Sequence, residues 1–206
     1  MLKKALSAGA IFAFLIGAAA AQDTGHFDVS LAFGGVLAQN SRNGTGTVAV
    51  EPTNSALLLA GFRFRFNRTN GIVLNFGRIN DSQIYVLPPD NYRVQAKINE
   101  YSGAYVLSPF HFEKLDPFFF AGGGALRFSP GNSYIDGFQS PFGAAHQTSM
   151  AFLYGAGLDY PVWKRVGLRL QYRGLIFKEP NFHLQQLVTN SKGHMPELSL
   201  GIVFNF

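Results

Sequence analysis

The chain lacks cysteine entirely and carries few charges. Of its 206 residues, only 14% are Asp, Glu, Lys or Arg, while 47% are hydrophobic. The absence of cysteine excludes a disulfide framework and thiolate chemistry, and the high hydrophobic content argues against disorder. Lys and Arg outnumber Asp and Glu by 17 to 12. The arginines are scattered singly through apolar segments, whereas a nucleic-acid-binding protein gathers its positive charge on one face, so we expect no nucleic-acid partner.

Long apolar runs are also missing after residue 21. Before it, Met1–Lys4 is positive, Ala5–Ala18 is apolar and Ala19–Ala21 is small. This order is typical of a cleaved secretory signal peptide. A membrane anchor is the alternative, but an apolar run of roughly 17 residues is shorter than the ~20 that span a bilayer. We therefore predict a signal peptide over residues 1–21, cleavage before Gln22, and one exported domain over residues 22–206.

The sequence is rich in aromatic residues and glycine, with 21 Phe, 8 Tyr and 23 Gly. Its apolar residues recur with period two, which indicates strands with two unlike faces. In the last segment Leu198, Leu200, Ile202, Phe204 and Phe206 share one face. Seven further segments alternate similarly, at residues 27–34, 58–66, 72–77, 93–107, 118–128, 149–160 and 166–173. In 93–107 the alternation slips, which predicts a β-bulge near Ile98.

The connectors between these segments alternate in length. Those at 39–54, 81–92, 129–147 and 178–194 are long, and those at 67–71, 108–116 and 161–165 are shorter. In outer-membrane barrels short turns lie on the periplasmic side and long loops outside the cell. One face of each strand is large and apolar, and the other carries small residues and charges. This polarity suits a barrel with lipid outside and a crowded interior. We predict an all-β fold, an eight-stranded antiparallel up-and-down transmembrane β-barrel; a soluble periplasmic barrel is the alternative.

Strand parity points nine charged residues into the lumen. They are Asp28, Arg63, Arg65, Glu100, Arg127, Asp159, Arg169, Arg173 and Glu197. Isolated charges in a narrow lumen are costly unless paired, so we predict an ion-pair network in which Asp159 and Arg169 are near-diagonal neighbours. The network either plugs the barrel, which we favour, or acts as a gate or selectivity filter. Arg78 has outward parity; either it reaches lipid phosphates or the register slips there.

The chain resembles the small outer-membrane β-barrel proteins of the OmpA transmembrane-domain and OmpX type, and more broadly the porin-like barrels. The resemblance rests on Phe118–Arg127, Phe152–Tyr160 and above all the terminal segment Glu197–Phe206. It implies a bacterial outer-membrane location, outer-membrane lipid as a partner, and a C-terminal insertion signal read by the barrel-assembly machinery. That signal comprises Ile202, Phe204 and Phe206. Aromatic residues at the short connectors form either an interfacial girdle or ordinary turn packing; they are Phe66, Phe110, Phe112, Tyr160 and Trp163.

We find no catalytic or cofactor-binding constellation in the sequence. His146 and Ser149 lack the His-x-Ser spacing of lipid A deacylase barrels, and His183 and His194 show no further ligand pattern. Gly122–Gly124 lacks the Lys-Ser/Thr of a phosphate-binding loop. We therefore predict no enzyme, cofactor or metal. The leading function is a structural or surface-interaction role through long external loops, with an unspecified partner. The alternatives are a porin-like channel for small solutes and a lipid-modifying enzyme.

Overall fold

Every long strand of the chain pairs with its neighbours in an antiparallel sheet. The computed structural model describes residues 27–37, 39–42, 49–87, 90–140, 143–184, 187–188 and 191–206. The expected signal peptide lies outside these residues. The elements are β1 (Phe27–Val36), β2 (Ser41–Arg42), β3 (Ala49–Pro52), β4 (Ser55–Arg65), β5 (Asn70–Leu87), β6 (Asp90–Leu107), β7 (Asp116–Ile135), β8 (Phe138–Gln139), β9 (Gln147–Pro161), β10 (Val166–Lys178) and β11 (Lys192–Asn205). No helix in the described part of the chain is long and apolar enough to cross a membrane.

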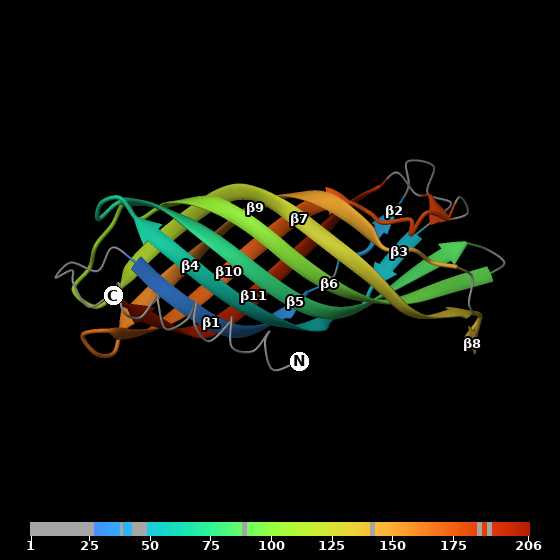
Figure 1. Ribbon diagram of the computed structural model, residues 1–206, viewed down its shortest axis with the longest axis horizontal. Helices are drawn as coiled ribbons and strands as arrows, with labels where there is room; N and C mark the ends of the chain where they lie inside the picture. The colour runs from blue at the N-terminus through green and yellow to red at the C-terminus, as the bar shows by residue number, and fades with distance from the viewer. Residues whose placement is uncertain are drawn as a thin grey trace, which may run out of the picture.

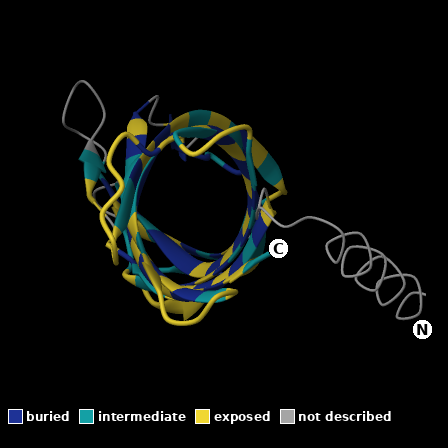
Figure 2. Ribbon diagram, turned by 90° about the vertical axis from the view of Figure 1, so that its left-hand side faces the viewer, coloured by how far each residue is buried: buried dark blue, intermediate teal, exposed yellow. Residues whose placement is uncertain are grey.

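The sheet closes on itself because its first strand pairs with its last. β1 pairs with β4 on one side and with β11 on the other, and β5 pairs with β6 to complete the circle. Eight long strands form the wall, namely β1, β4, β5, β6, β7, β9, β10 and β11. Figure 2 shows the resulting ring along its axis. The predicted eight-stranded antiparallel up-and-down transmembrane barrel is confirmed.

The two ends of the barrel differ. The turns at residues 66–69, 108–115 and 162–165 lie at one end together with Phe206, and we call this the short-turn end. At the opposite end, the loop end, β5, β6 and β7 continue past the barrel and the short strands β2, β3 and β8 join them (Figure 1). The separation of short and long connectors therefore follows the alternation in the sequence.

Residues 81–87 and 90–92, expected to lie in a loop, are paired antiparallel strands instead. β5 continues to Leu87 and β6 starts at Asp90, with Tyr85 opposite Tyr92. The expected loop at 39–54 likewise contains β2 and β3, and β3 pairs with the extension of β5. This region is polar enough to resemble a loop, but its backbone groups pair above the barrel wall and Val50 and Val94 are buried there.

The irregularity predicted near Ile98 lies a few residues away. Ile98 pairs regularly with Ile79 and Phe128, whereas the register with β7 shifts between Val94 and Ala96. Ala96 faces Pro130, and proline has no N–H to donate to a strand ladder, which places it at bulges and edges. The proline of the partner strand thus gives a physical reason for the site of the bulge.

The apolar faces point outward as expected on every strand with an assigned face except β7. Phe33, Leu74 and Phe152, for example, are 67%, 57% and 52% exposed. On β7 the prediction is wrong, because Phe118, Phe120, Leu126 and Phe128 are buried, while Phe119 and Arg127 are exposed. The rings of Phe118 and Phe120 occupy the space that side chains on Gly157 and Gly155 of β9 would fill. Glycines on the neighbouring strand therefore make room for large residues inside.

Candidate functional site

Two arginines and two aspartates form a compact cluster inside the barrel toward the short-turn end. Asp28 lies directly opposite Arg63 on β4, and Asp159 lies directly opposite Arg169 on β10 rather than on the predicted diagonal. Arg63 Nε is 2.6 Å from Asp28 Oδ2, Arg169 Nε is 2.7 Å from Asp159 Oδ1, and Arg169 Nη2 is 3.0 Å from Asp28 Oδ1. Arg63 also contacts Asp159. The two arginines and the two aspartates thus alternate with one another, and their charges sum to zero.

The edge of this cluster meets solvent at the short-turn end. Arg65 Nη2 lies 3.4 Å from Asp28 and 3.7 Å from Asp159, and the Arg65 side chain is 28% exposed. A pocket of about 180 Å³ opens here, lined in part by Arg65, Asp116 and Asp159. The more deeply placed Arg63 and Arg169 are each only 2% exposed. The pocket therefore gives access to the outer edge of the cluster.

Phe118 holds both deep arginines from the β7 side. Its ring centroid is 4.9 Å from the guanidinium carbon of Arg63 and 5.3 Å from that of Arg169. A guanidinium over an aromatic face is electrostatically favourable, more so when it is desolvated. The inward position of Phe118 thus has an energetic reason beyond the glycine opposite it.

A second charged cluster crosses the middle of the lumen. Arg173 stands directly opposite Glu197, with Nε 3.1 Å from Glu197 Oε2, and it also contacts Glu100 from the far wall. Ser102 donates to Glu100 Oε1 at 2.5 Å, and Asn75 donates to Ser102 at 3.4 Å. The side chains of Arg173, Glu100 and Glu197 are at most 1% exposed. One arginine thus links two glutamates across the interior.

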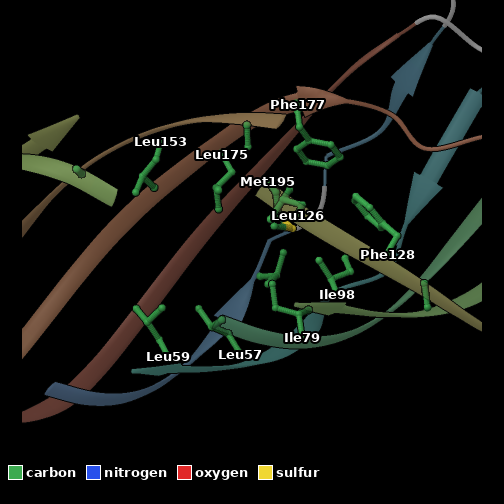
Figure 3. Close-up of a cluster of buried hydrophobic side chains, with 14 of the residues drawn as sticks. Leu57, Leu59, Ile79, Ile98, Leu126, Phe128, Leu153, Leu175, Phe177 and Met195 are labelled. Atoms are coloured by element: carbon green, nitrogen blue, oxygen red, sulfur yellow. The ribbon is translucent and has the colours of Figure 1, made fainter. Parts of the chain in front are cut away.

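The loop-end half of the interior is mainly apolar, and the buried acids Asp81 and Glu179 lie still nearer the loop end. Figure 3 shows side chains from opposite walls converging on one cluster. Its labelled members are Leu57, Leu59, Ile79, Ile98, Leu126, Phe128, Leu153, Leu175, Phe177 and Met195. The expectation of a lumen filled by small and ionic groups is therefore incomplete. At this end the inward positions hold large aliphatic and aromatic side chains, which exclude water by packing.

A segment of the last loop covers this apolar cluster. Phe182, fully buried and at φ +51°, packs edge-on against Phe128 and Tyr85, with ring centroids 6.4 Å away in each case. Gln147 Oε1 accepts hydrogen bonds from the backbone N–H groups of Asn181 and Phe182 at 2.9 and 2.7 Å. The Tyr85 hydroxyl donates to the Pro180 carbonyl at 2.5 Å. The loop is therefore fixed at both its backbone and its aromatic side chain.

The remaining predicted residues lie on the outer surface. Arg127, expected in the lumen, is exposed on the outer wall because β7 is inverted, and Arg78 is exposed as its parity predicts. Phe66, Phe110, Phe112, Tyr160 and Trp163 are all exposed and lie at the short-turn end. On β11, Ile202 and Phe204 face outward, each 46% exposed. The Phe206 backbone N–H donates to the Phe27 carbonyl at 2.9 Å, beside the seam that closes the barrel.

A polar contact on the outer wall is the arrangement most similar to a catalytic one. Tyr154 hydroxyl lies 2.8 Å from His194 Nε2, and His194 Nδ1 lies 2.8 Å from Gln39 Oε1. Both ring nitrogens are thus engaged, and a neutral amide stands where a carboxylate would orient a catalytic histidine. His146 and His183 are exposed. Among the described residues, no group of three or more His, Cys, Asp or Glu could hold a metal ion.

Sequence reasoning missed the apolar half of the lumen and its cover. A signal was present, because Leu57, Leu59 and Ile79 occupy inward positions at the loop ends of their strands, above the small and charged positions. The burial of Phe182 had no such signal. It depends on Gln147 and Tyr85, which lie 35 and 97 residues away in the chain and meet it only in the folded barrel.

The chain matches the model of one known protein family. Residues 6–206 match the model of a family described as the outer membrane protein beta-barrel domain. Neisserial surface protein A is 17% identical, with a TM-score of 0.57 over 88% of this chain and 97% of that protein. The outer membrane protein OprG of Pseudomonas aeruginosa is 11% identical, with a TM-score of 0.60 over 88% of this chain and 96% of OprG. At these identities the two structures show a shared fold alone. No curated protein sequence matches the chain significantly.

Proposed function

Because the chain belongs to the outer-membrane β-barrel family, we propose that it is a closed, non-conducting barrel that presents its loop end outside the cell for contact with another molecule. The packed interior is the observation that carries this proposal. The Asp28–Arg63–Asp159–Arg169 cluster, the Glu100–Arg173–Glu197 cluster and the apolar cluster succeed one another along the axis. The interior of an eight-stranded barrel has only enough room for side chains. An ion moving along the axis would therefore be blocked by side chains at three successive positions.

The loop end supports a role in surface contact. The turn between β7 and β8 has positive φ at both central residues, 50° at Asp136 and 84° at Gly137. This is the Asp-Gly combination typical of tight, rigid hairpin turns. The following residue, Phe138, pairs with Ile135 and is 80% exposed. An exposed aromatic side chain on a rigid hairpin is the kind of group that anchors protein interfaces.

A channel for small solutes is the alternative function. Planar-bilayer recordings of the purified protein separate the two, since the closed barrel should give no stable single-channel steps. Stable conductance steps in the wild-type protein would contradict the closed barrel and favour the porin-like channel.

Activity as a lipid-modifying enzyme is a third candidate function with a separate test. Lipid A from expressing cells should be chemically unchanged, and a deacylated product would contradict the proposal.

The proposed orientation can be tested separately by cysteine labelling, because the native chain contains no cysteine that would react in the background. A Phe138→Cys variant should react on intact cells with a maleimide that cannot cross the outer membrane. A Trp163→Cys variant, at the exposed turn of the opposite end, should react only after the outer membrane is permeabilised. The reverse pattern would place the loop end in the periplasm.

The last strand supports a second partner, the barrel-assembly machinery. Ile202 and Phe204 project from β11 on the face turned away from the interior, and the Phe206 backbone lies beside the seam. We therefore extend the proposal to a role of these three residues in recognition during insertion. Substituting Phe204 and Phe206 by Ala should lower the amount of folded barrel in cells, while refolding of the purified chain in detergent should change much less. Equal losses in both settings would indicate a purely structural role.

A further inference from the structure

The outer wall of β5, β6 and β7 changes from apolar to polar between two rows of residues. Phe76, Tyr101, Ala125 and Met150 stand opposite one another across β5, β6, β7 and β9. Two residues nearer the loop end, the facing row is Arg78, Asn99, Arg127 and Thr148. Phe76, Tyr101 and Met150 are all well exposed. In a membrane barrel this step marks where hydrocarbon gives way to the headgroup region.

Three cations lie at this boundary. Arg78 and Arg127 flank Asn99 in the polar row, and Lys97 stands on β6 one row closer to the loop end, opposite Asn80 and Ser129. All three are exposed. From the ordinary spacing of strands and of same-face residues, their Cα atoms form a triangle about 8–10 Å on each side. Side chains as long as Arg and Lys can converge on one anion over Asn99.

No acid balances these charges within the described residues. The salt bridges there involve none of Arg78, Lys97 and Arg127. The nearby acids of the same strands, Asp81 and Glu100, are buried on the inner side. Like charges gathered on one face of a sheet repel each other. An anion bound from outside would attract all three side chains and so offset their mutual repulsion.

We infer that Arg78, Lys97 and Arg127 form a binding site for the phosphate groups of a phosphorylated lipid in the outer leaflet. Arginine binds phosphate through paired hydrogen bonds and lysine adds a mobile point charge. Charged side chains near the membrane interface cost about 0–1 kcal/mol, far less than at the midplane. The adjoining row of Phe76, Tyr101 and Met150 offers apolar surface for acyl chains, which a soluble phosphate would not use. This inference rests on the proposed orientation, with the loop end outside the cell.

The test uses the full mature chain in detergent and bis-phosphorylated lipid A as the probe. Binding is measured by titration, with the rise in the temperature of heat-induced unfolding as a second readout. The variant Arg78→Gln/Lys97→Gln/Arg127→Gln should bind lipid A at least about tenfold more weakly, a difference of about 1.4 kcal/mol. The matched control, Lys114→Gln/Lys164→Gln/Arg165→Gln, removes the same charge from exposed positions at the short-turn end and should bind like wild type.

Two further ligands separate lipid from other sources of phosphate. Lipid A stripped of both phosphates and inorganic phosphate alone should each fail to protect the wild-type barrel. The inference is overturned if the Arg78→Gln/Lys97→Gln/Arg127→Gln variant binds lipid A as tightly as wild type, or if the control variant loses as much affinity as this variant. It is also overturned if the wild-type barrel binds dephosphorylated lipid A as tightly as bis-phosphorylated lipid A. A failed orientation would instead appear in the Phe138→Cys labelling on cells, with lipid A binding in detergent intact.

Discussion

At the scale of single residues, the interior charges are stabilised by their neighbours rather than by water. Arg173 illustrates this, since it is fully enclosed between Glu100 and Glu197. Removing one partner of a buried ionic group leaves the others unpaired in a low-dielectric site, which costs about 3–5 kcal/mol. Replacing the whole group by neutral side chains of similar size is much less costly.

We therefore expect Arg173→Met to destabilise the folded barrel by about 3–5 kcal/mol. The triple variant Glu100→Gln/Arg173→Met/Glu197→Gln should recover most of this loss because no charge remains unpaired. Urea-induced unfolding in lipid vesicles measures both, with Arg68→Met at an exposed turn position as the control. If the triple variant were less stable than the single one, the charges would be contributing more than mutual neutralisation.

We expect the docking of the last loop to depend on pH through the buried carboxyl group of Glu179. Burial raises the pKa of Glu179 to about 7, the negative charge of Asp81 adds to this rise, and the hydrogen bond from Ser41 opposes it. The docked loop therefore binds the proton more tightly than the free loop, whose pKa is near 4.5. Docking is strongest below pH 4.5, weakens as the pH rises toward 7, and levels off above that.

Hydrogen exchange of the backbone amides of Glu179 and of residues 181–184 measures this effect. In the wild-type protein we expect their protection factors, corrected for intrinsic rates, to fall by about tenfold or more between pH 5 and pH 8. Glu179→Gln should keep them high and flat over this range. A wild-type profile independent of pH would show that Glu179 stays charged in the docked loop.

At the scale of whole strands, β7 differs from its neighbours in the face that it turns inward. Single-cysteine variants in bilayers can test this orientation with a lipid-soluble maleimide. We expect Phe119→Cys to react readily and Phe118→Cys and Phe120→Cys to react at least about tenfold more slowly, since positions 118 and 120 are buried. On β9, Phe152→Cys and Leu153→Cys give the matched outward and inward references. Faster labelling of Phe118→Cys than of Phe119→Cys would show instead that Phe118 lies on the outward face, as the sequence alone predicts.

The strands themselves were predictable from the sequence because each spanning segment faces two different environments. Their period-two pattern is clear at residues 198–204 of β11 and 166–172 of β10, where the outward residues are all apolar. β7 is ambiguous, because both of its faces carry phenylalanine. The deciding information lies on another strand, where Gly155 and Gly157 leave room for the rings of β7.

The same limit applies to the candidate site. Parity correctly locates a pair such as Asp159 and Arg169 on one face of neighbouring strands, because both strands have a clear alternation. It fails for Arg127, since the orientation of β7 is set by neighbours and not by its own pattern. Beyond the membrane the lipid no longer imposes the alternation, and the paired strands at 81–87 and 90–92 therefore resemble a loop in sequence.

At the scale of the whole molecule, the interior is divided into compartments by the Glu100–Arg173–Glu197 cluster. The apolar cluster on one side is covered by Phe182, and the aspartate–arginine cluster on the other meets the short-turn pocket. Opening one mouth should therefore leave the other unaffected. This independence distinguishes a septum made of side chains from a continuous pore that a single loop happens to cover.

Phe182→Ala is the substitution that tests this division. It should expose the apolar cluster, so that a cysteine at Leu126, which is fully buried, reacts at least about tenfold faster with a small cationic thiol reagent. A cysteine at Ser30, beside Arg169 on the short-turn side of the septum, should react at the same rate with and without the Phe182→Ala substitution, which also excludes a general loosening of the fold. The Phe182→Ala barrel should still give no conductance steps in planar bilayers, because the two charged clusters remain in place. Conductance in this variant would mean that the loop, and not the charged septum, keeps the barrel closed.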